Sequence, residues 1–155
     1  MIFLNKIGKL IVGIGFLILL FIFFFSIEIK HKQIKMIKEY EMNYIKIDSV
    51  QILNVIVDGI TKEKLNNNYA CLEKLDSNII IAGHGILPVF QNLSNIENND
   101  IIIVSYNGMT ENYYVTNKYI VNINDFNYFK EKNSLILITC IDNDNRLIIV
   151  SKKMA

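Results

Sequence analysis

A cysteine and an arginine near the C-terminus are spaced so that they could act together. The chain reads LILITCIDNDNR over residues 135–146, and five residues separate Cys140 from Arg146. If those five residues form a hairpin loop, the two residues lie directly opposite each other, with Cβ atoms about 5 Å apart. A cation beside a thiol favours the thiolate and can hydrogen-bond a developing oxyanion. A shift of one residue in the register would instead send the two side chains to opposite faces.

His84 is the third residue with suitable chemistry. It ends the apolar run NIIIAGH and is the one histidine of the chain that lies outside the charged segment 28–43. A cysteine and a histidine are the minimum for thiol acyl transfer, in which one attacks a carbonyl carbon and the other moves protons. Structural roles remain open, because a free cysteine is often a small core residue and a lone histidine can cap a backbone carbonyl. Spacing in the sequence does not by itself bring His84 to Cys140.

Other groups of polar residues give weaker signals. Cys71 and Cys140 could pair outside the cell, but two cysteines are too few for a disulfide scaffold. These cysteines and His84 show no zinc-ligand spacing, so we expect neither a metal site nor a cofactor. Asp142 and Asp144 could bind a cation, although hairpin loops ordinarily contain aspartate.

Short β-rich segments carry these residues. Asn107-Gly108 predicts a tight hairpin turn, since Asn-Gly accepts the positive φ angles that such turns need. Seven or eight strands with brief helices predict one all-β domain, a barrel or a sandwich, over residues 44–155. The expected strands are 44–50, 51–59, 78–83, 100–106, 111–123, 135–140 and 146–152, with helical segments at 61–69, 88–96 and 125–133.

The N-terminal part of the chain is strongly apolar. Residues 10–27 carry no charge and, as a helix, would be about 27 Å long, close to the thickness of a bilayer core. A cleavable signal peptide is the alternative, but its apolar core is shorter and a small-x-small site should follow. We therefore predict a short tail at 1–9, an uncleaved transmembrane anchor at 10–27 and a charged helical stalk at 28–43.

Charge gives two further indications. The net charge is +1, which offers no basis for nucleic-acid binding. More lysines follow the predicted anchor than precede it, so the positive-inside rule by itself mildly favours a cytoplasmic location for the C-terminal part.

Taken together, these motifs resemble the sortase family, the membrane-anchored cysteine transpeptidases of Gram-positive bacteria. The matching stretches are IIIAGHG around His84, LILITC ending in Cys140, and Arg146 at the start of the last strand. The stretches FQNLSNIENNDIIIVSYNG and YIKIDSVQILNVIVDGI are also similar to the family, and the resemblance covers about residues 44–152.

The resemblance implies a fold and a reaction. The fold would be the eight-stranded sortase β-barrel. Cys140 would attack the Thr–Gly carbonyl of an LPxTG-like sorting signal and form a thioacyl enzyme. His84 would protonate the leaving amine and then help to activate an incoming amine from a cell-wall precursor or a pilin. Arg146 would hold the substrate and stabilise the oxyanion.

Further implications concern the substrate groove and the subclass. Ala82 and Ile138 would line the groove for the Leu-Pro part of the signal, and Thr139 would border the nucleophile. Gly85 stands where the family commonly has a polar residue, and Ile136 where it often has threonine. The N-terminal anchor resembles classes A and D, and a calcium requirement stays open.

The family places its catalytic domain outside the cell, on a single membrane anchor, and we give this more weight than the lysine bias. The alternative function is that of a catalytically degenerate, membrane-anchored β-barrel that binds sorting signals or cell-wall partners.

Overall fold

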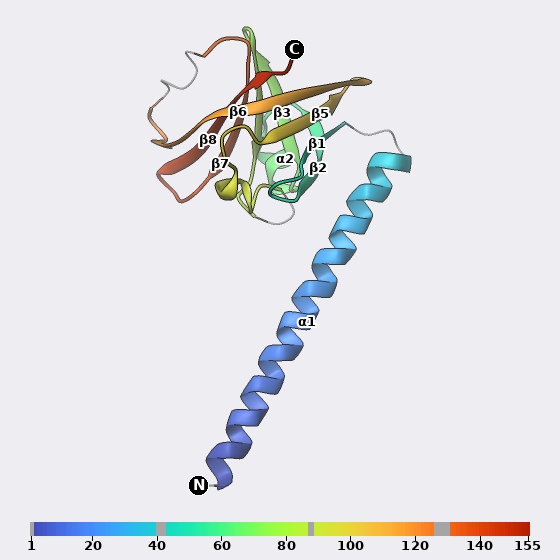
Figure 1. The fold of residues 1–155 in the computed structure, drawn as a ribbon, viewed down its shortest axis with the longest axis vertical. Helices are drawn as coiled ribbons and strands as arrows, with labels where there is room; N and C mark the ends of the chain where they lie inside the picture. The colour runs from blue at the N-terminus through green and yellow to red at the C-terminus, as the bar shows by residue number, and fades with distance from the viewer. Residues whose placement is uncertain (1, 40–42, 87–88, 126–130) are drawn as a thin grey trace.

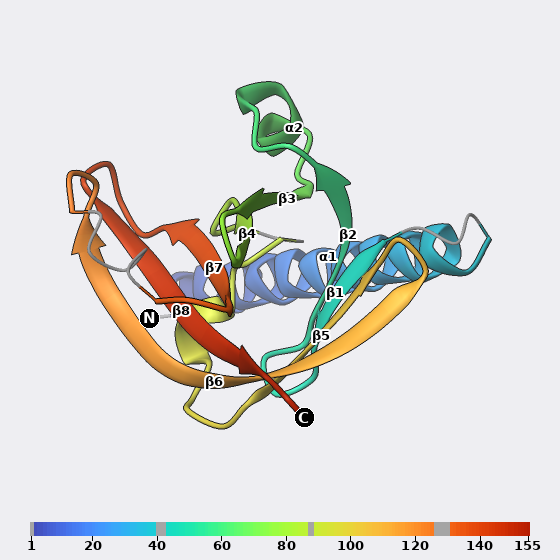
Figure 2. The same ribbon diagram turned by 90° about the horizontal axis from the view of Figure 1, so that it is seen from above.

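Eight strands close into a barrel in the part of the chain that this computed structural model describes, which is residues 2–39, 43–86, 89–125 and 131–155. The strand order around the barrel is β1-β2-β3-β4-β7-β8-β6-β5 (Figures 1 and 2). This confirms the predicted eight-stranded all-β barrel. The elements are α1 (Ile2–Glu39), β1 (Tyr44–Ile47), β2 (Ile52–Asp58), α2 (Lys62–Asn66), β3 (Ala70–Leu75), β4 (Asn78–Gly83), η1 (Leu93–Asn95), β5 (Ile101–Tyr106), β6 (Met109–Asn122), β7 (Ser134–Cys140) and β8 (Asn145–Lys153).

The N-terminal helix α1 runs through both the apolar stretch and the charged stretch and extends away from the barrel (Figure 1). Within the described part of the chain, no helix combines the length and the apolarity needed to cross a membrane. No membrane-spanning helix is thus found at the predicted anchor, residues 10–27, in the described part of the chain.

Strand β3 is a correction to the sequence analysis, which predicted no strand between residues 59 and 78. The strand pairs in parallel with β2 and antiparallel with β4. Its first three residues, Ala70 to Leu72, are buried, and its last three are exposed. A strand that is apolar over only half its length, and that follows an Asn-rich segment, lacks the alternation by which a strand is recognised.

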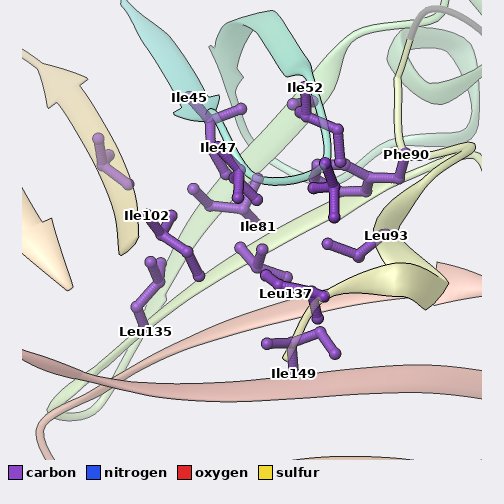
Figure 3. Packing of buried hydrophobic residues seen from close by; sticks show 14 of the residues in the cluster. Ile45, Ile47, Ile52, Ile81, Phe90, Leu93, Ile102, Leu135, Leu137 and Ile149 are labelled. Carbon is purple, nitrogen blue, oxygen red and sulfur yellow. The ribbon is translucent and has the colours of Figure 1, made fainter. Parts of the chain in front are cut away.

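Strands β4, β7 and β8 are buried on both faces, which explains their nearly continuous apolar sequences. Inside the barrel, Ile81, Leu137 and Ile149 belong to the main core (Figure 3). A second cluster covers the outer face of the same strands, where Ile60 and Val121 pack against them. The buried members of this outer cluster are Ile80, Ile136, Ile148 and Val150.

Asn78 ties the start of β4 to the start of β7. The side chain is 5% exposed. Its Nδ2 donates to the Glu131 carbonyl at 2.6 Å, and its Oδ1 accepts from the Ser134 N–H at 3.0 Å. From this end the two strands run in parallel register, from Ile79 opposite Leu135 to Gly83 opposite Thr139. One carboxamide therefore helps to fix the register of two strands that are distant in the sequence.

Replacing Asn78 should test this link. We expect Asn78→Ala to lower the free energy of unfolding by about 1–3 kcal/mol, because it removes the partners of a partly buried carbonyl and a buried N–H. Urea denaturation measures the change. Asn112→Ala, which alters an exposed asparagine on β6, is the control and should stay within about 0.5 kcal/mol of the wild type. Equal stability of the two variants would contradict the role of Asn78 in linking β4 to β7.

Candidate active site

His84 and Cys140 lie side by side at the ends of two neighbouring strands. Gly83, the last residue of β4, is paired with Thr139 of β7 in parallel register. His84 directly follows Gly83, and Cys140 directly follows Thr139. The two residues therefore occupy equivalent positions on neighbouring strands, whose backbones lie about 4.8 Å apart. Equivalent positions in a parallel pair direct their side chains to the same face. The structure thus brings together two residues that the sequence spacing could not connect.

Arg146 lies opposite Cys140, as the length of the loop predicted. The antiparallel register of β7 and β8 runs from Ser134 opposite Lys152 to Cys140 opposite Arg146. The segment 141–144 is the turn, and the Ile141 N–H donates to the Asn145 carbonyl at 3.1 Å. All three candidate residues therefore meet at one end of the barrel.

The Arg146 guanidinium is held by the turn itself. Its Nη1 donates to the carbonyls of Asp142 and Asn145, both at 2.9 Å, and more weakly to that of Asn143 at 3.4 Å. The arginine that the sequence assigned to a thiol and its substrate is thus anchored by main-chain oxygens in the structure.

The carboxylate of Asp142 organises the same turn. It accepts from the backbone N–H groups of Asp144 and Asn145 and from the Asn145 side chain. These bonds lower the pKa of Asp142, the Asn145 side chain contributing most. The sequence analysis considered Asp142 as a cation ligand. Among the described residues, no group of three or more His, Cys, Asp or Glu side chains could hold a metal.

A pocket of about 460 Å³ opens at the pair formed by His84 and Cys140. Gly85, Ile86 and Ile141 also line it. Asn66, at the end of α2, and Asn68, in the loop that follows, complete the lining. These two carboxamides were missed, because asparagines are frequent throughout this chain and no spacing links them to the cysteine.

Gly85 allows the chain after His84 to lie against the end of β7. A Cβ atom at this position would be 2.7 Å from the carbonyl oxygen of Cys140 and 3.2 Å from Oγ1 of Thr139. That Thr139 oxygen is buried and has no hydrogen-bond partner among the described residues. The absence of a side chain at Gly85 therefore permits the close approach of the two strand ends.

The three residues predicted for the groove do not share one face. Ala82 of β4 is paired with Ile138 of β7, both are partly exposed, and Ile138 packs against the outer apolar cluster. Thr139, the next residue, points the opposite way and is 4% exposed. Ala82 and Ile138 therefore lie on the outer surface of the barrel, whereas the Thr139 side chain is buried on the opposite face.

Cys71 is paired with Ala82 but does not line this pocket. Both cysteines are free, Cys71 being buried and Cys140 exposed. Burial raises the pKa of the Cys71 thiol. Cys71 is therefore much less suited to act as a nucleophile than Cys140.

Fold and site together define a closed β-barrel protein with a cysteine–histidine pair at one end. A family model described as a Sortase domain matches residues 45–154. Since this match covers more than half of the chain, the chain belongs to the sortase family, whose members are cysteine transpeptidases.

Solved structures agree with this assignment of the fold. A lid mutant of sortase A from Corynebacterium diphtheriae is similar with a TM-score of 0.65 at 21% identity, over 74% of this chain and 70% of that one. Sortase C1 from Streptococcus agalactiae gives 0.64 at 23% identity, over 73% and 67%. Sortase C from Clostridium perfringens, solved with the C-terminal cell wall sorting motif, gives 0.64 at 17% identity, over 72% and 69%.

These scores are nearly equal for sortases A and C, so the fold does not decide between subclasses. A comparison with curated proteins gives no match.

The two thiols should differ in reactivity. We expect iodoacetamide to modify the folded chain once, at Cys140, and the unfolded chain twice, because Cys71 is 0% exposed. Peptide mass spectrometry identifies the modified residue. Modification of Cys71 in the folded chain, or a peptide with the two cysteines joined, would contradict the structure.

Adding a methyl group at Gly85 should disturb the site more than the fold. We expect Gly85→Ala to reduce turnover of a sorting-signal peptide by about tenfold or more, since the added atom forces the strand ends apart. The free energy of unfolding should fall by about 1–3 kcal/mol. Ile86→Ala, which removes atoms from the next residue, is the comparison and should lose less activity. Wild-type turnover by Gly85→Ala would show that the close approach is not needed.

Proposed function

We propose that this chain is a cysteine transpeptidase that cleaves an LPxTG-like sorting signal between Thr and Gly. It joins the new Thr end to an amine of a cell-wall precursor or a pilin. The observation that carries the proposal is the pocket in which Cys140 and His84 meet at the ends of adjacent strands. Such a pair supplies both the nucleophile and the proton carrier that acyl transfer requires.

In the first step the Cys140 sulfur forms a bond to the Thr carbonyl carbon and the C–N bond to Gly breaks. The leaving amine takes its proton from His84, and the thioacyl enzyme remains. Arg146, opposite the cysteine, supplies a positive charge toward the oxyanion that forms on the carbonyl oxygen.

In the second step an incoming amine attacks the thioacyl carbon. It gives a proton to His84, the C–S bond breaks, and Cys140 is released as a thiolate that can react again. The new amide bond joins the two substrates, so no external energy source or cofactor enters the reaction.

The outer face of β4 and β7 supports the choice of substrate. Ala82 and Ile138 present a small apolar surface beside the pocket, continuous with the outer cluster. A Leu-Pro dipeptide can be buried there, while the Thr carbonyl reaches Cys140. A protein of similar fold, sortase C from Clostridium perfringens, has been solved with the C-terminal cell wall sorting motif. Both substrates are components of the bacterial surface, so we place the domain outside the cytoplasm.

Peptide turnover tests the proposal. The full chain is incubated with fluorogenic LPxTG-like peptides and an amine acceptor, and mass spectrometry identifies the product. We expect turnover by the wild type and none by Cys140→Ala, because the thiolate is the attacking group. Cys71→Ser is the matched control and should retain wild-type turnover.

Two outcomes decide against the proposal. Equal turnover by wild type and Cys140→Ala would exclude Cys140 as the nucleophile. Binding of the peptides without turnover, across a broad peptide library, would favour the degenerate binding barrel instead.

A further inference from the structure

The turn between β7 and β8 is assembled around one side chain. Both backbone N–H groups on the returning side of the turn point to Oδ1 of Asp142, from Asp144 at 2.9 Å and from Asn145 at 2.8 Å. The Asn145 side chain adds bonds of 3.1 and 2.9 Å to the two carboxylate oxygens. The carboxylate thus fixes the path of the chain immediately before Arg146.

The shape of this turn determines where carbonyl oxygens point. The carbonyls of Asp142, Asn143 and Asn145 all face Nη1 of Arg146. Two of these oxygens belong to the four-residue turn and the third to Asn145, the first residue of β8, and they converge on one nitrogen only if the turn is closed. The side chain of Asp142 closes it by binding the N–H groups, so the carbonyls are left for the guanidinium.

The guanidinium is held from one side only. Every hydrogen bond that it makes to the described residues leaves from Nη1. Nη2 and Nε have three further N–H groups that can donate to a substrate. An arginine anchored through one nitrogen keeps its orientation while the rest of its planar fork stays available.

We propose that Asp142 is a positioning residue that holds Arg146 opposite Cys140. In this orientation the Nη2 and Nε groups of Arg146 are available to the substrate carbonyl. The inference rests on the proposed function, because it assigns Asp142 a part in that same reaction. Asp142 touches neither substrate nor thiol, and it acts through the turn and the arginine.

Asp144 shows why the effect should be specific to one carboxylate. It is an exposed aspartate in the same turn, and its side chain makes no hydrogen bond to the described residues. Removing either carboxylate changes the net charge equally, but only Asp142 accepts the N–H groups. Asp144→Ala is therefore the matched control for charge.

The experiment compares steady-state kinetics of full-chain variants on the fluorogenic peptide. We expect Asp142→Ala to lower kcat by about tenfold with a smaller change in KM, since the misplaced donors act mainly on the oxyanion. Asp142→Asn keeps an oxygen that can accept both backbone N–H groups, so it should stay within about threefold of the wild type. Asp144→Ala should resemble the wild type.

A double-variant cycle tests whether Asp142 acts through Arg146. Arg146→Lys removes the planar fork that the turn holds. In that background, adding Asp142→Ala should change kcat less than twofold, because coupled residues give non-additive effects. Equal effects of Asp142→Ala in the two backgrounds would overturn the inference. Wild-type kinetics of Asp142→Ala would also overturn the inference. A rise in kcat would overturn it too, because it would mean that the turn keeps the arginine away from the substrate.

A readout independent of turnover separates this inference from the proposed function. In NMR spectra, the side-chain Nη signals of Arg146 should be resolved in the wild type and in Asp144→Ala, and should merge in Asp142→Ala as the guanidinium rotates freely. Unchanged signals in Asp142→Ala would overturn the anchoring. A wild-type chain that shows the anchoring but no turnover would overturn the proposed function and the catalytic part of this inference together.

Discussion

The parallel pairing of β4 with β7 is the constraint on which the rest of the site depends. The two strands are separated in the sequence by η1, β5 and β6, yet they lie next to each other in the barrel. Asn78 fixes their register at one end, and the absence of a side chain at Gly85 lets their other ends meet. The distance between His84 and Cys140 is therefore set by the hydrogen bonds of a rigid sheet and not by a flexible loop, which favours a constant geometry for proton transfer.

Local patterns in the sequence predicted the features that depend on local geometry. The five residues after Cys140 were enough to predict that Arg146 lies opposite it, because loop length determines register in an antiparallel hairpin. The proximity of His84 to Cys140 depends on a crossover between distant strands, and no local pattern contains that information. Only the resemblance to a family supplied it in advance, and the topology of the barrel now accounts for it.

The features that were missed are those without a periodic or motif signal. Strand β3 is apolar over half its length, and the pocket asparagines lie among many others of the same type. The part played by Asp142 depends on which backbone groups face its carboxylate, and turn composition alone does not reveal this. The predicted anchor rested on hydropathy, and no membrane-spanning helix is found among the described residues.

Closure of the barrel has a consequence for how a peptide can be recognised. Each of the eight strands has a partner on both sides, so the described part of the barrel offers no free edge to which a peptide could add as a further strand. A bound peptide cannot draw most of its affinity from a ladder of main-chain bonds, which would accept almost any sequence. Its binding must come from a few side chains around the strand ends, and small changes in the surrounding loops are then enough to change which sequence is accepted.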